Sequence, residues 1–342
     1  MRVAMYYSNK DVRIESMPIP KLSEGELLVR VHSSGICGSD LMEWYRVNKA
    51  PCVLGHEVAG EVFEVGQGVT GFDIGDKVVF THHVPCNNCR YCMRDNHTLC
   101  DTLHATSFDP GGFAEYIRLP RINVDKGGVI KMPEGLDFDV ATFAEPLGCV
   151  LRGLGRINIL PGDSVLVLGS GMAGLLNIKV AIALGAGRVV ATDIHDLRIE
   201  AAKDSGASSV FNGLQPELTD ILLADNGTKF DHVIVCAAGE TVFRQAMSVV
   251  EKGGSILLYA FSAPAAKFQF SLNEFFSQGI SIFTTYGASP IDLLQAIELL
   301  HYGRVRVSDL ITHKLELDQT SLGFQLAADG SESLKVIIRP NN

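Results

Sequence analysis

The stretch VLVLGSGMAGLLNIKVAIALGAGRVVATD, residues 165–193, decides how this chain folds. A short apolar run is followed at once by GSGMAG, which has the spacing G-x-G-x-x-G. Gly169 permits a tight turn, Gly171 lets a ligand approach the backbone, and Gly174 allows close packing of a helix on a strand. The stretch therefore predicts a strand, a glycine-rich turn and a helix, followed by a second strand that ends at Asp193.

The turn and Asp193 together predict a dinucleotide site. The unpaired N–H groups at the helix start, around Met172 and Ala173, can meet a pyrophosphate. Asp193 can bind the adenosine ribose hydroxyls, and its charge would repel the 2′-phosphate of NADP, so NAD is favoured. Arg198 and His195 could instead pair with such a phosphate. The alternative is a glycine turn with an incidental surface aspartate.

The residues after Pro161 alternate between strand-like and helix-like segments, which predicts a doubly wound parallel sheet. The strand-like segments include VLVLG, RVVATD, SSVFN, DHVIVCA, SILLYA and ISIFTT, and the helix-like ones include GMAGLLNIKVAIALG, HDLRIEAAKDSG and TVFRQAMSVVEKGG.

The residues before this region differ in pattern. Short strands with frequent turn signals predict a β-rich domain over residues 1–145, with strand-like segments such as ELLVRVHSSGI, HEVAGEVFEVG, DKVVFTHHV and GGFAEYIRLP. After Pro290, the helix-like IDLLQAIELLHYG and the strand-like ITHKLEL and LKVIIRP form a tail that is expected to return to this first domain.

Composition argues against several classes of partner. The 342-residue chain is 46% hydrophobic and 20% charged, and its net charge is −10. Nucleic acid and anionic membranes need a basic surface, so neither is expected as a partner. The N-terminus lacks the apolar run of a signal peptide, and Lys179 and several glycines interrupt the one stretch apolar enough to suggest a membrane span. A cytoplasmic location follows as an expectation.

Half of the eight cysteines lie in PCNNCRYCMRDNHTLC, residues 85–100. Their spacing is C-x2-C-x2-C-x7-C, with the ligand candidates Cys86, Cys89, Cys92 and Cys100. Four thiolates in one loop can close a tetrahedral shell around Zn²⁺, which predicts a structural rather than a catalytic site. An iron–sulfur cluster and unliganded thiols are the alternatives, although the ferredoxin spacing differs.

Three further fragments carry metal-ligand residues: GICGSD, LGHEVAG and FAEPLGC. Cys37, His56 and Glu145 could supply three zinc ligands and leave a fourth position open, as a catalytic zinc requires. Taken alone, each residue also has a non-functional interpretation. Cys37 could be a buried thiol, His56 a structural histidine and Glu145 a solvated carboxylate.

With these motifs in this order, the sequence resembles the zinc-dependent medium-chain dehydrogenase/reductase family, and within it the sorbitol, threonine and sugar-alcohol dehydrogenase branch. The resemblance implies a GroES-like catalytic domain (1–145 and 290–342) with a structural zinc lobe (86–100) and an inserted Rossmann domain (146–289). It also implies an active site in the cleft between the domains.

The resemblance also implies roles for single residues. Cys37, His56 and Glu145 resemble the ligands of a catalytic zinc, and Glu57 resembles a carboxylate that can approach the metal. Ser39 resembles the hydroxyl that takes the proton of the alcohol. The implied activity is reversible hydride transfer from a secondary alcohol, polyol or sugar-derived alcohol to NAD⁺, with one catalytic and one structural Zn²⁺ per chain.

Two departures from the family pattern bear on mechanism and substrate. Many relatives have a histidine three residues after the serine, whereas this chain has Met42, so the proton must run through ribose and water, or through another group such as His104. The Arg-Tyr pair usual in sorbitol-type enzymes is replaced by Thr284 and Thr285 after Phe283.

Smaller signals lie in the loop after Cys37. Trp44 could line the substrate pocket or pack the loop. Arg46 and Lys49 could attract an anionic substrate, but solvated surface cations are commoner. Cys149 is expected to be a packing residue, and His82 and His83 are expected to be structural.

Two alternatives to the dehydrogenase reading remain: a zinc-free enone or quinone reductase of the same superfamily, and a non-catalytic nucleotide-binding protein. The expected partner is a small alcohol or ketone. By analogy with the branch, we expect a homo-oligomer, either a tetramer or a dimer.

Overall fold

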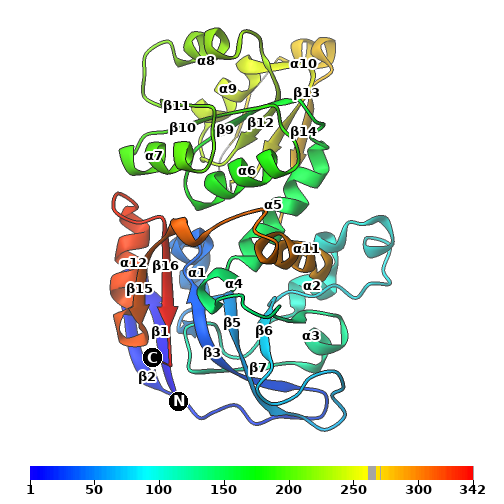
Figure 1. The fold of residues 1–342 in the computed structure, drawn as a ribbon, viewed down its shortest axis with the longest axis vertical. Helices are drawn as coiled ribbons and strands as arrows, with labels where there is room; N and C mark the ends of the chain where they lie inside the picture. The colour runs from blue at the N-terminus through cyan, green and yellow to red at the C-terminus, as the bar shows by residue number, and fades with distance from the viewer. Residues whose placement is uncertain (261–266, 270, 342) are drawn as a thin grey trace. The chain divides into compact units, whose positions relative to one another are not determined.

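A computed structural model describes residues 1–260, 267–269 and 271–341 (Figure 1). The chain divides into two compact units. The split unit comprises Met1–Gly148 and Gly287–Asn342, and the inserted unit comprises Cys149–Tyr286.

A six-stranded parallel sheet forms the centre of the inserted unit, in the order β11-β10-β9-β12-β13-β14. Its strands are β9 (Ser164–Leu168), β10 (Arg188–Asp193), β11 (Ser209–Asn212), β12 (Phe230–Val235), β13 (Val250–Leu258) and β14 (Ser281–Thr284). These strands are apolar because helices cover both faces of the sheet. The predicted doubly wound parallel sheet is confirmed.

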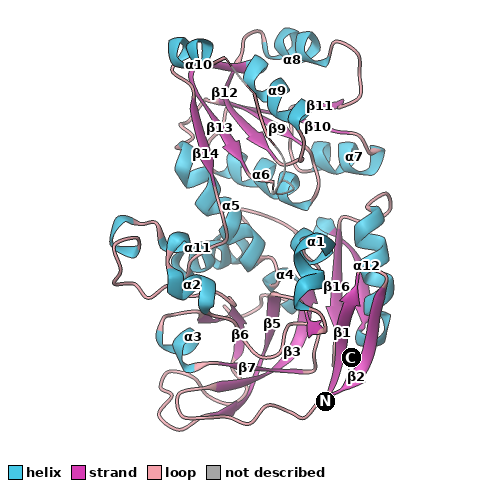
Figure 2. Cartoon of the chain, turned by 180° about the vertical axis from the view of Figure 1, so that it is seen from behind, coloured by secondary structure: helices cyan, strands magenta, loops and turns pink. Residues whose placement is uncertain are grey.

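The helices of this unit lie on the two sides of the sheet, with α6 and α7 on one side and α8, α9 and α10 on the other (Figures 1 and 2). Their bounds are α6 (Met172–Ala183), α7 (Asp196–Asp204), α8 (Leu218–Asn226), α9 (Glu240–Val249) and α10 (Leu272–Gln278). A further helix, α5 (Ala144–Ile157), spans the boundary between the two units in sequence.

Two β-sheets form the framework of the split unit. The larger has the order β15-β16-β3-β5-β6-β8, with β7 also pairing with β3, and the smaller has the order β2-β1-β4. The bounds are β1 (Arg2–Ser8), β2 (Asp11–Ser16), β3 (Leu27–Gly35), β4 (Cys52–Val53), β5 (Glu57–Val65), β6 (Lys77–Phe80), β7 (Tyr116–Leu119), β8 (Val129–Lys131), β15 (Ile311–Glu316) and β16 (Lys335–Arg339).

Short helices connect these strands: α1 (Glu43–Arg46), α2 (Asp101–Ala105), α3 (Arg121–Asp125), α4 (Phe138–Ala141), α11 (Pro290–His301) and α12 (Thr320–Asp329). The 3₁₀ turns are η1 (Gly38–Leu41), η2 (Val47–Lys49), η3 (Cys92–Arg94), η4 (His97–Leu99), η5 (Ser308–Leu310) and η6 (Leu317–Gln319).

The C-terminal tail completes the larger sheet of the split unit. The last strand, β16, pairs antiparallel with β3, with Ile337 opposite Gly35 and Ile338 opposite Ser34. The neighbouring strand β15 runs parallel to β16. The tail therefore lies beside the strand that leads into the Cys37 loop.

One predicted helix proved too long. The segment TVFRQAMSVVEKGG was expected to be helical throughout, but α9 ends at Val249 and β13 begins at Val250. The boundary was missed because the β-branched residues Val249 and Val250 fit a strand as well as a helix. The periodicity of such a short apolar run does not distinguish a helix from a strand.

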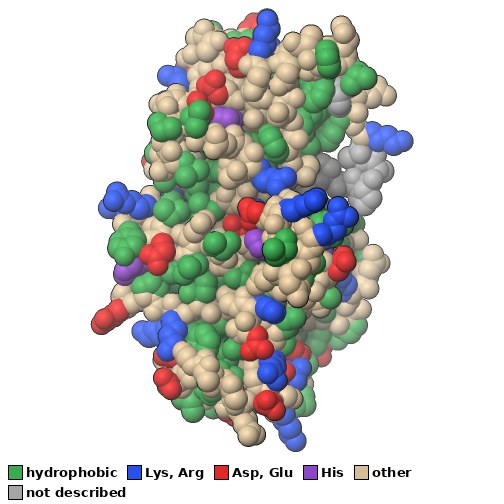
Figure 3. Space-filling view, turned by 90° about the vertical axis from the view of Figure 1, so that its right-hand side faces the viewer, with side chains coloured by type: hydrophobic (Ala, Val, Ile, Leu, Met, Phe, Trp, Pro, Cys, Tyr) green, Lys and Arg blue, Asp and Glu red, His purple; other side chains and the backbone are tan. Residues whose placement is uncertain are grey.

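The face drawn in Figure 3 carries basic side chains singly or in small groups, with acidic side chains between them. Among the residues described, no helix combines the length and the low polarity needed to cross a bilayer.

Candidate active site and metal centres

The pairing of β3 with β5 brings the first set of candidate ligands together. The last residue of β3, Gly35, lies opposite the first residue of β5, Glu57. Cys37 follows β3 by two residues and His56 directly precedes β5, so this register places both side chains at the same end of the sheet. The sulfur of Cys37, a ring nitrogen of His56 and a carboxylate oxygen of Glu57 all lie within 4.8 Å of one another.

This donor set suits zinc, which binds thiolate, imidazole and carboxylate groups. Three donors also leave room for a further ligand, which is the pattern of a catalytic rather than a structural zinc. The structure thus brings together Cys37, predicted from CGSD, and His56, predicted from GHE.

The carboxylate of Asp40 contacts both His56 and the backbone of Cys37. Its Oδ1 lies 3.4 Å from His56 Nδ1, and its Oδ2 accepts a hydrogen bond from the Cys37 N–H at 3.1 Å. A carboxylate on one nitrogen fixes the ring and leaves the other nitrogen, Nε2, for a metal. Burial acts to raise the pKa of Asp40, but the charges of His56 and Arg46 and the Cys37 N–H hold the pKa below its usual value.

Ser39 lies beside this group in η1. Its Oγ is 3.4 Å from His56 Nε2 and accepts a hydrogen bond from Arg46 Nη2 at 3.1 Å. Arg46 also donates from Nε to the backbone oxygen of Ser39 at 2.9 Å. The Arg46 side chain is only 15% exposed, so the expectation of a solvated surface cation is wrong for this residue. Lys49 is exposed.

Lys335 is a functional candidate that the sequence analysis missed. It lies in β16, and its ammonium group donates to the carboxylate of Glu57 and to the backbone oxygen of Ile36. The side chains of Lys335 and Glu57 are each 1% exposed. Gly35 makes this pair possible, because a Cβ there would lie 2.3 Å from Glu57 Oε2 and 2.8 Å from Lys335 Cε. The only signal in the sequence is a lysine within the apolar strand LKVII.

Glu145 is not part of the Cys37–His56–Glu57 group. It lies buried in the first turn of α5. The ring of Phe143, two residues earlier, is 5.6 Å from Lys335 Nζ, so this segment borders the same cluster. The role of Glu145 as a ligand stays a prediction.

The other residues singled out in this region surround the group. The ring of His82 lies against the ring of His83 at a tilt of 38°, with centroids 3.7 Å apart, and its centroid is 5.0 Å from that of the His56 ring. Burial and the neighbouring histidines lower the pKa of His82 well below its usual value, which keeps its ring neutral. Met42 follows η1 as its C-cap, and the Trp44 side chain is 45% exposed.

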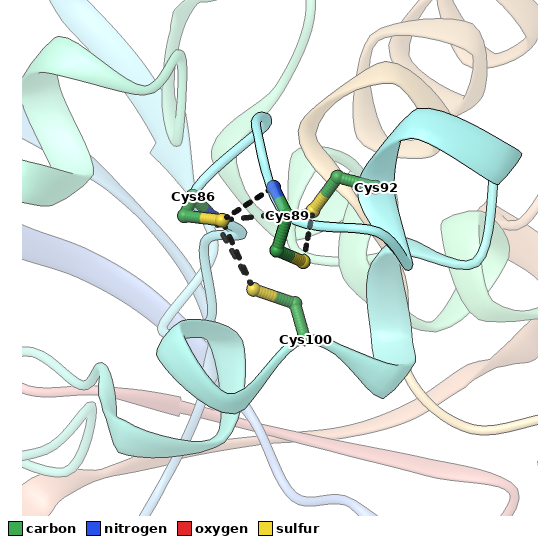
Figure 4. A group of neighbouring side chains, drawn as sticks. All are labelled: Cys86, Cys89, Cys92 and Cys100. Carbon is green, nitrogen blue, oxygen red and sulfur yellow. Dashed lines mark hydrogen bonds between the residues drawn. The ribbon is translucent and has the colours of Figure 1, made fainter.

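The four clustered cysteines converge on one point in the split unit (Figure 4). Their sulfurs all lie within 4.8 Å of one another, with Cys86–Cys100 at 3.6 Å and Cys89–Cys92 at 3.5 Å. Zn–S bonds of about 2.3 Å in a tetrahedron place the sulfurs roughly 3.8 Å apart. The four thiols therefore fit a closed zinc shell.

Backbone N–H groups favour the thiolate form at two of these cysteines. The N–H of Cys86 donates to Cys100 Sγ at 3.4 Å, and the N–H of Cys89 donates to Cys86 Sγ at 3.3 Å. Burial acts to raise the pKa of Cys100, but hydrogen bonds from the backbone and from Cys86 lower the pKa to about 6. A thiolate is the form that binds metal.

The glycine-rich turn of the inserted unit has the geometry expected from its sequence. Gly169 has φ +95°, and a Cβ at Gly174 would lie 2.0 Å from the backbone oxygen of Gly169. A Cβ at Gly171, the N-cap of α6, would meet nothing within 4 Å. Space beside an uncapped helix start can admit a phosphate.

Asp193 ends β10 next to this turn. Its Oδ2 accepts from the Ser170 N–H at 2.8 Å, and its Oδ1 accepts from the N–H groups of Ile194 and His195 at 2.8 and 3.0 Å. A carboxylate offers about four acceptor positions, so one remains for a ribose hydroxyl. Met172 and Ala173 form the first turn of α6, and Arg198 lies in the first turn of α7.

Comparison with known proteins agrees with this geometry. Residues 23–134 match the family described as alcohol dehydrogenase GroES-like domain, and residues 173–301 match the family described as zinc-binding dehydrogenase. Sorbitol dehydrogenase from Bacillus subtilis (strain 168) is 30% identical over all of this chain and 98% of its own length.

The chain belongs to the zinc-dependent medium-chain dehydrogenase/reductase family.

Further relatives span the whole chain. L-threonine 3-dehydrogenase from Chelativorans sp. (strain BNC1) is 32% identical over 95% of this chain and 94% of its own. The structure of alcohol dehydrogenase TADH from Thermus sp. ATN1 superimposes with a TM-score of 0.87 at 31% identity, covering 99% of both chains. As a member of this family, the protein is an oxidoreductase with a GroES-like domain and a Rossmann-like domain.

Proposed function

We propose that this protein is an NAD-dependent, zinc-containing dehydrogenase that oxidises a secondary alcohol, polyol or sugar-derived alcohol reversibly. One observation carries the proposal: the donor atoms of Cys37, His56 and Glu57 lie within 4.8 Å of one another beside the hydroxyl of Ser39. Named relatives that act on sorbitol and L-threonine support a substrate with a secondary hydroxyl group.

The proposed roles follow from the donor types. Cys37, His56 and Glu145 would hold a catalytic zinc. Glu57 is a further carboxylate, with an oxygen within 4.8 Å of the donor atoms of Cys37 and His56. When bound, zinc acts as a Lewis acid that makes the alcohol hydroxyl more acidic. Ser39 exchanges the proton with the reacting oxygen, while Asp40 keeps the His56 ring oriented through Nδ1.

We assign the structural zinc to Cys86, Cys89, Cys92 and Cys100. Three of their S···S distances are 3.5, 3.6 and 4.0 Å and all lie within 4.8 Å, which supports a four-thiolate shell. Such a shell leaves no position for substrate, so this second metal stabilises its loop and takes no part in catalysis.

We assign dinucleotide binding to the inserted unit and catalysis to the split unit. The pyrophosphate would lie on the first turn of α6, against Gly171, Met172 and Ala173. NAD is preferred to NADP because Asp193 presents a buried carboxylate beside the glycine turn. Arg198 is the residue that would favour NADP. We further propose a cytoplasmic homo-oligomer.

The test measures nicotinamide absorbance with zinc-loaded protein, NAD⁺ or NADP⁺, and a panel of polyols, amino alcohols, sugar phosphates and simple secondary alcohols. We expect NAD-linked turnover, two zinc ions per chain, and loss of about 10³-fold or more in kcat when Glu145 is changed to alanine. Cys100→Ser should lower the metal content to one zinc per chain while the remaining zinc still supports turnover.

Two outcomes would contradict the proposal. Turnover of enones or quinones by the metal-free protein would indicate the zinc-free reductase. Zinc and NAD⁺ binding without turnover of any compound in the panel would indicate a non-catalytic nucleotide-binding protein. If Glu57→Gln abolishes the catalytic zinc and Glu145→Ala does not, the third ligand is Glu57.

A further inference from the structure

Arg46 contacts Ser39 at two points. Its Nε donates to the Ser39 backbone oxygen at 2.9 Å, and its Nη2 donates to Ser39 Oγ at 3.1 Å. The same Nη2 lies 3.5 Å from Oδ1 of Asp40, a side chain with no exposed surface. The guanidinium therefore holds the backbone and the hydroxyl of one residue in a fixed geometry, which a planar fork of donors does better than a flexible ammonium group.

The bond from Arg46 restricts where the hydroxyl hydrogen of Ser39 can point. A hydroxyl has one hydrogen to donate and two acceptor positions, whereas arginine only donates. With one acceptor position filled by Arg46, the hydrogen must point elsewhere. His56 Nε2 lies 3.4 Å from the same Oγ, and a ring nitrogen of His56 lies within 4.8 Å of the donor atoms of Cys37 and Glu57.

Met42 does not offer Ser39 a comparable bond. The side chain three residues after Ser39 is a thioether, which can neither carry a proton nor orient a hydroxyl effectively. Arg46 lies four residues further on, in α1, and its guanidinium reaches back over η1 to Ser39.

An alternative role for Arg46, the direct capture of an anionic substrate, fits less well. Two of its nitrogens are engaged by Ser39 and its side chain is 15% exposed. Lys49, the other cation of the same loop, is exposed, and its ammonium group donates to the hydroxyl of Tyr45 at 3.3 Å.

We propose that Arg46 is a positioning residue that turns the hydroxyl hydrogen of Ser39 toward the reacting oxygen. In ketone reduction, the hydride comes from NADH, the O–H bond of Ser39 breaks as a new O–H bond forms on the product oxygen, and the serine oxygen then regains a proton from water. In alcohol oxidation the same proton moves in reverse. The inference rests on the proposed function and adds to it a residue that this chain uses to orient the proton-transfer group.

The first test is a double-mutant cycle on the zinc-loaded enzyme, with the panel alcohol that wild type oxidises fastest. Arg46→Gln should lower kcat by about tenfold to a hundredfold, within the range for a misplaced acid–base group, and leave the KM for NAD⁺ unchanged. Arg46→Lys should recover part of the loss. In a Ser39→Ala background, Arg46→Gln should change kcat less than about twofold, because the hydroxyl it positions is gone.

The second test is an equilibrium measurement without turnover. Acetamide presents a carbonyl oxygen that accepts a hydrogen bond but cannot be reduced by NADH. Its dissociation constant in the presence of NADH, measured by calorimetry, should rise by a similar factor of about five to tenfold in Ser39→Ala and in Arg46→Gln, and no further in the double variant.

Lys49→Gln is the matched control, because it removes a cation from the same loop without a contact to Ser39, and both readouts should stay at wild-type values. The inference would be overturned if Arg46→Gln lowered kcat by the same factor in the Ser39→Ala background as in the wild-type background. It would also be overturned if wild type bound acetamide no more tightly than Ser39→Ala does. Failure of wild type to bind zinc or to turn over any alcohol would instead contradict the proposed function.

Discussion

Lys335 is a buried cation whose partner is a candidate metal-site carboxylate. The Lys335 and Glu57 side chains are each 1% exposed, so each charge depends on the other for compensation. Removing one partner of a buried pair strands the other charge and costs about 3–5 kcal/mol. Zinc at Cys37 and His56 would supply a second cation beside Glu57, so the cost should depend on the metal.

The first prediction is that Lys335→Met lowers the free energy of unfolding of the chelator-treated protein by about 3 kcal/mol, and that zinc restores much of this loss. Denaturant unfolding with EDTA and with zinc measures both values. The control is the double variant Lys335→Met with Glu57→Gln, which removes both charges and should be closer to wild type. A loss that is the same in the double variant would show that packing, and not the charge on Glu57, is responsible.

Short motifs in the sequence pointed to Cys37 and His56, which the structure places in one cluster of ligand-type side chains. Cys37 and His56 stand in CGSD and GHE, whose spacing and residue types already suggest ligands. The sequence did not reveal Lys335, because 278 residues separate Lys335 from Glu57 and only the pairing of β16 with β3 brings them together. It also misjudged Arg46, because a loop arginine carries no sign of burial.

Among the elements, the turn between β9 and α6 depends on Gly174. A Cβ there would lie 2.0 Å from the Gly169 backbone oxygen, and backbone cannot move aside as a flexible side chain can. We expect Gly174→Ala to shift α6 away from β9, to lower the free energy of unfolding by about 2 kcal/mol or more, and to weaken NAD⁺ binding.

Gly155 provides the matched control for this prediction. It lies in α5, is exposed, and a Cβ there would meet nothing within 4 Å. Gly155→Ala should therefore stabilise the protein by up to about 1 kcal/mol through helix propensity. Fluorescence titration with NADH and thermal unfolding measure both variants, and normal NADH affinity in Gly174→Ala would contradict the role given to this glycine.

Asp139 joins α4 to the C-terminal strands of the split unit. Its carboxylate, 1% exposed, pairs with Arg339 of β16, with Lys314 of β15 at 2.8 Å, and accepts from Ser33 Oγ at 2.6 Å. Burial acts to raise its pKa, but these donors hold the pKa below its usual value. Its stabilising contribution is therefore complete above the unfolded pKa of about 3.9 and is lost as the pH falls through the lower folded value.

The third prediction compares Asp139→Asn with wild type from pH 7 to pH 3. At pH 7 the variant should be less stable by about 2 kcal/mol, a value discounted because both cations are partly exposed. The difference should shrink below about pH 4, as the wild-type carboxylate becomes protonated. Asp11→Asn is the control, because its pair with Arg13 is exposed to solvent and should contribute little to stability at any of these pH values.

Periodicity located most elements but not all boundaries. The strands β9 and β10 were visible as apolar runs bounded by glycines, and α6 followed from the glycine spacing. The helix α12 was missed, because TSLGFQLAAD contains an internal glycine that lowers its helical signal. That glycine, Gly323, allows α12 to pack closely against Ile36, since a Cβ added at this position would lie 2.9 Å from Ile36 Cδ1.

At the scale of the whole molecule, the two units carry different candidate ligand sites. All seven residues of the two candidate metal-ligand groups lie in Met1–Gly148, whereas the glycine turn and Asp193 lie in Cys149–Tyr286. A ligand stabilises the unit that binds it by RT ln(1 + [L]/Kd), about 2.7 kcal/mol at a hundredfold excess over Kd. Zinc and NAD⁺ should therefore stabilise different parts of one chain.

The last prediction is that scanning calorimetry resolves two transitions with separate ligand responses. Chelation of zinc should lower the transition of the split unit, because both the four-thiol loop and the Cys37–His56 group lose their metal. NAD⁺ should raise the transition of the inserted unit, and Gly174→Ala should abolish that rise without changing the response to chelation. The chain passes between the units at only two points, Gly148–Cys149 and Tyr286–Gly287, which favours separate unfolding. A single transition that responds to both ligands would show instead that the units unfold as one cooperative body, with each ligand stabilising the whole chain.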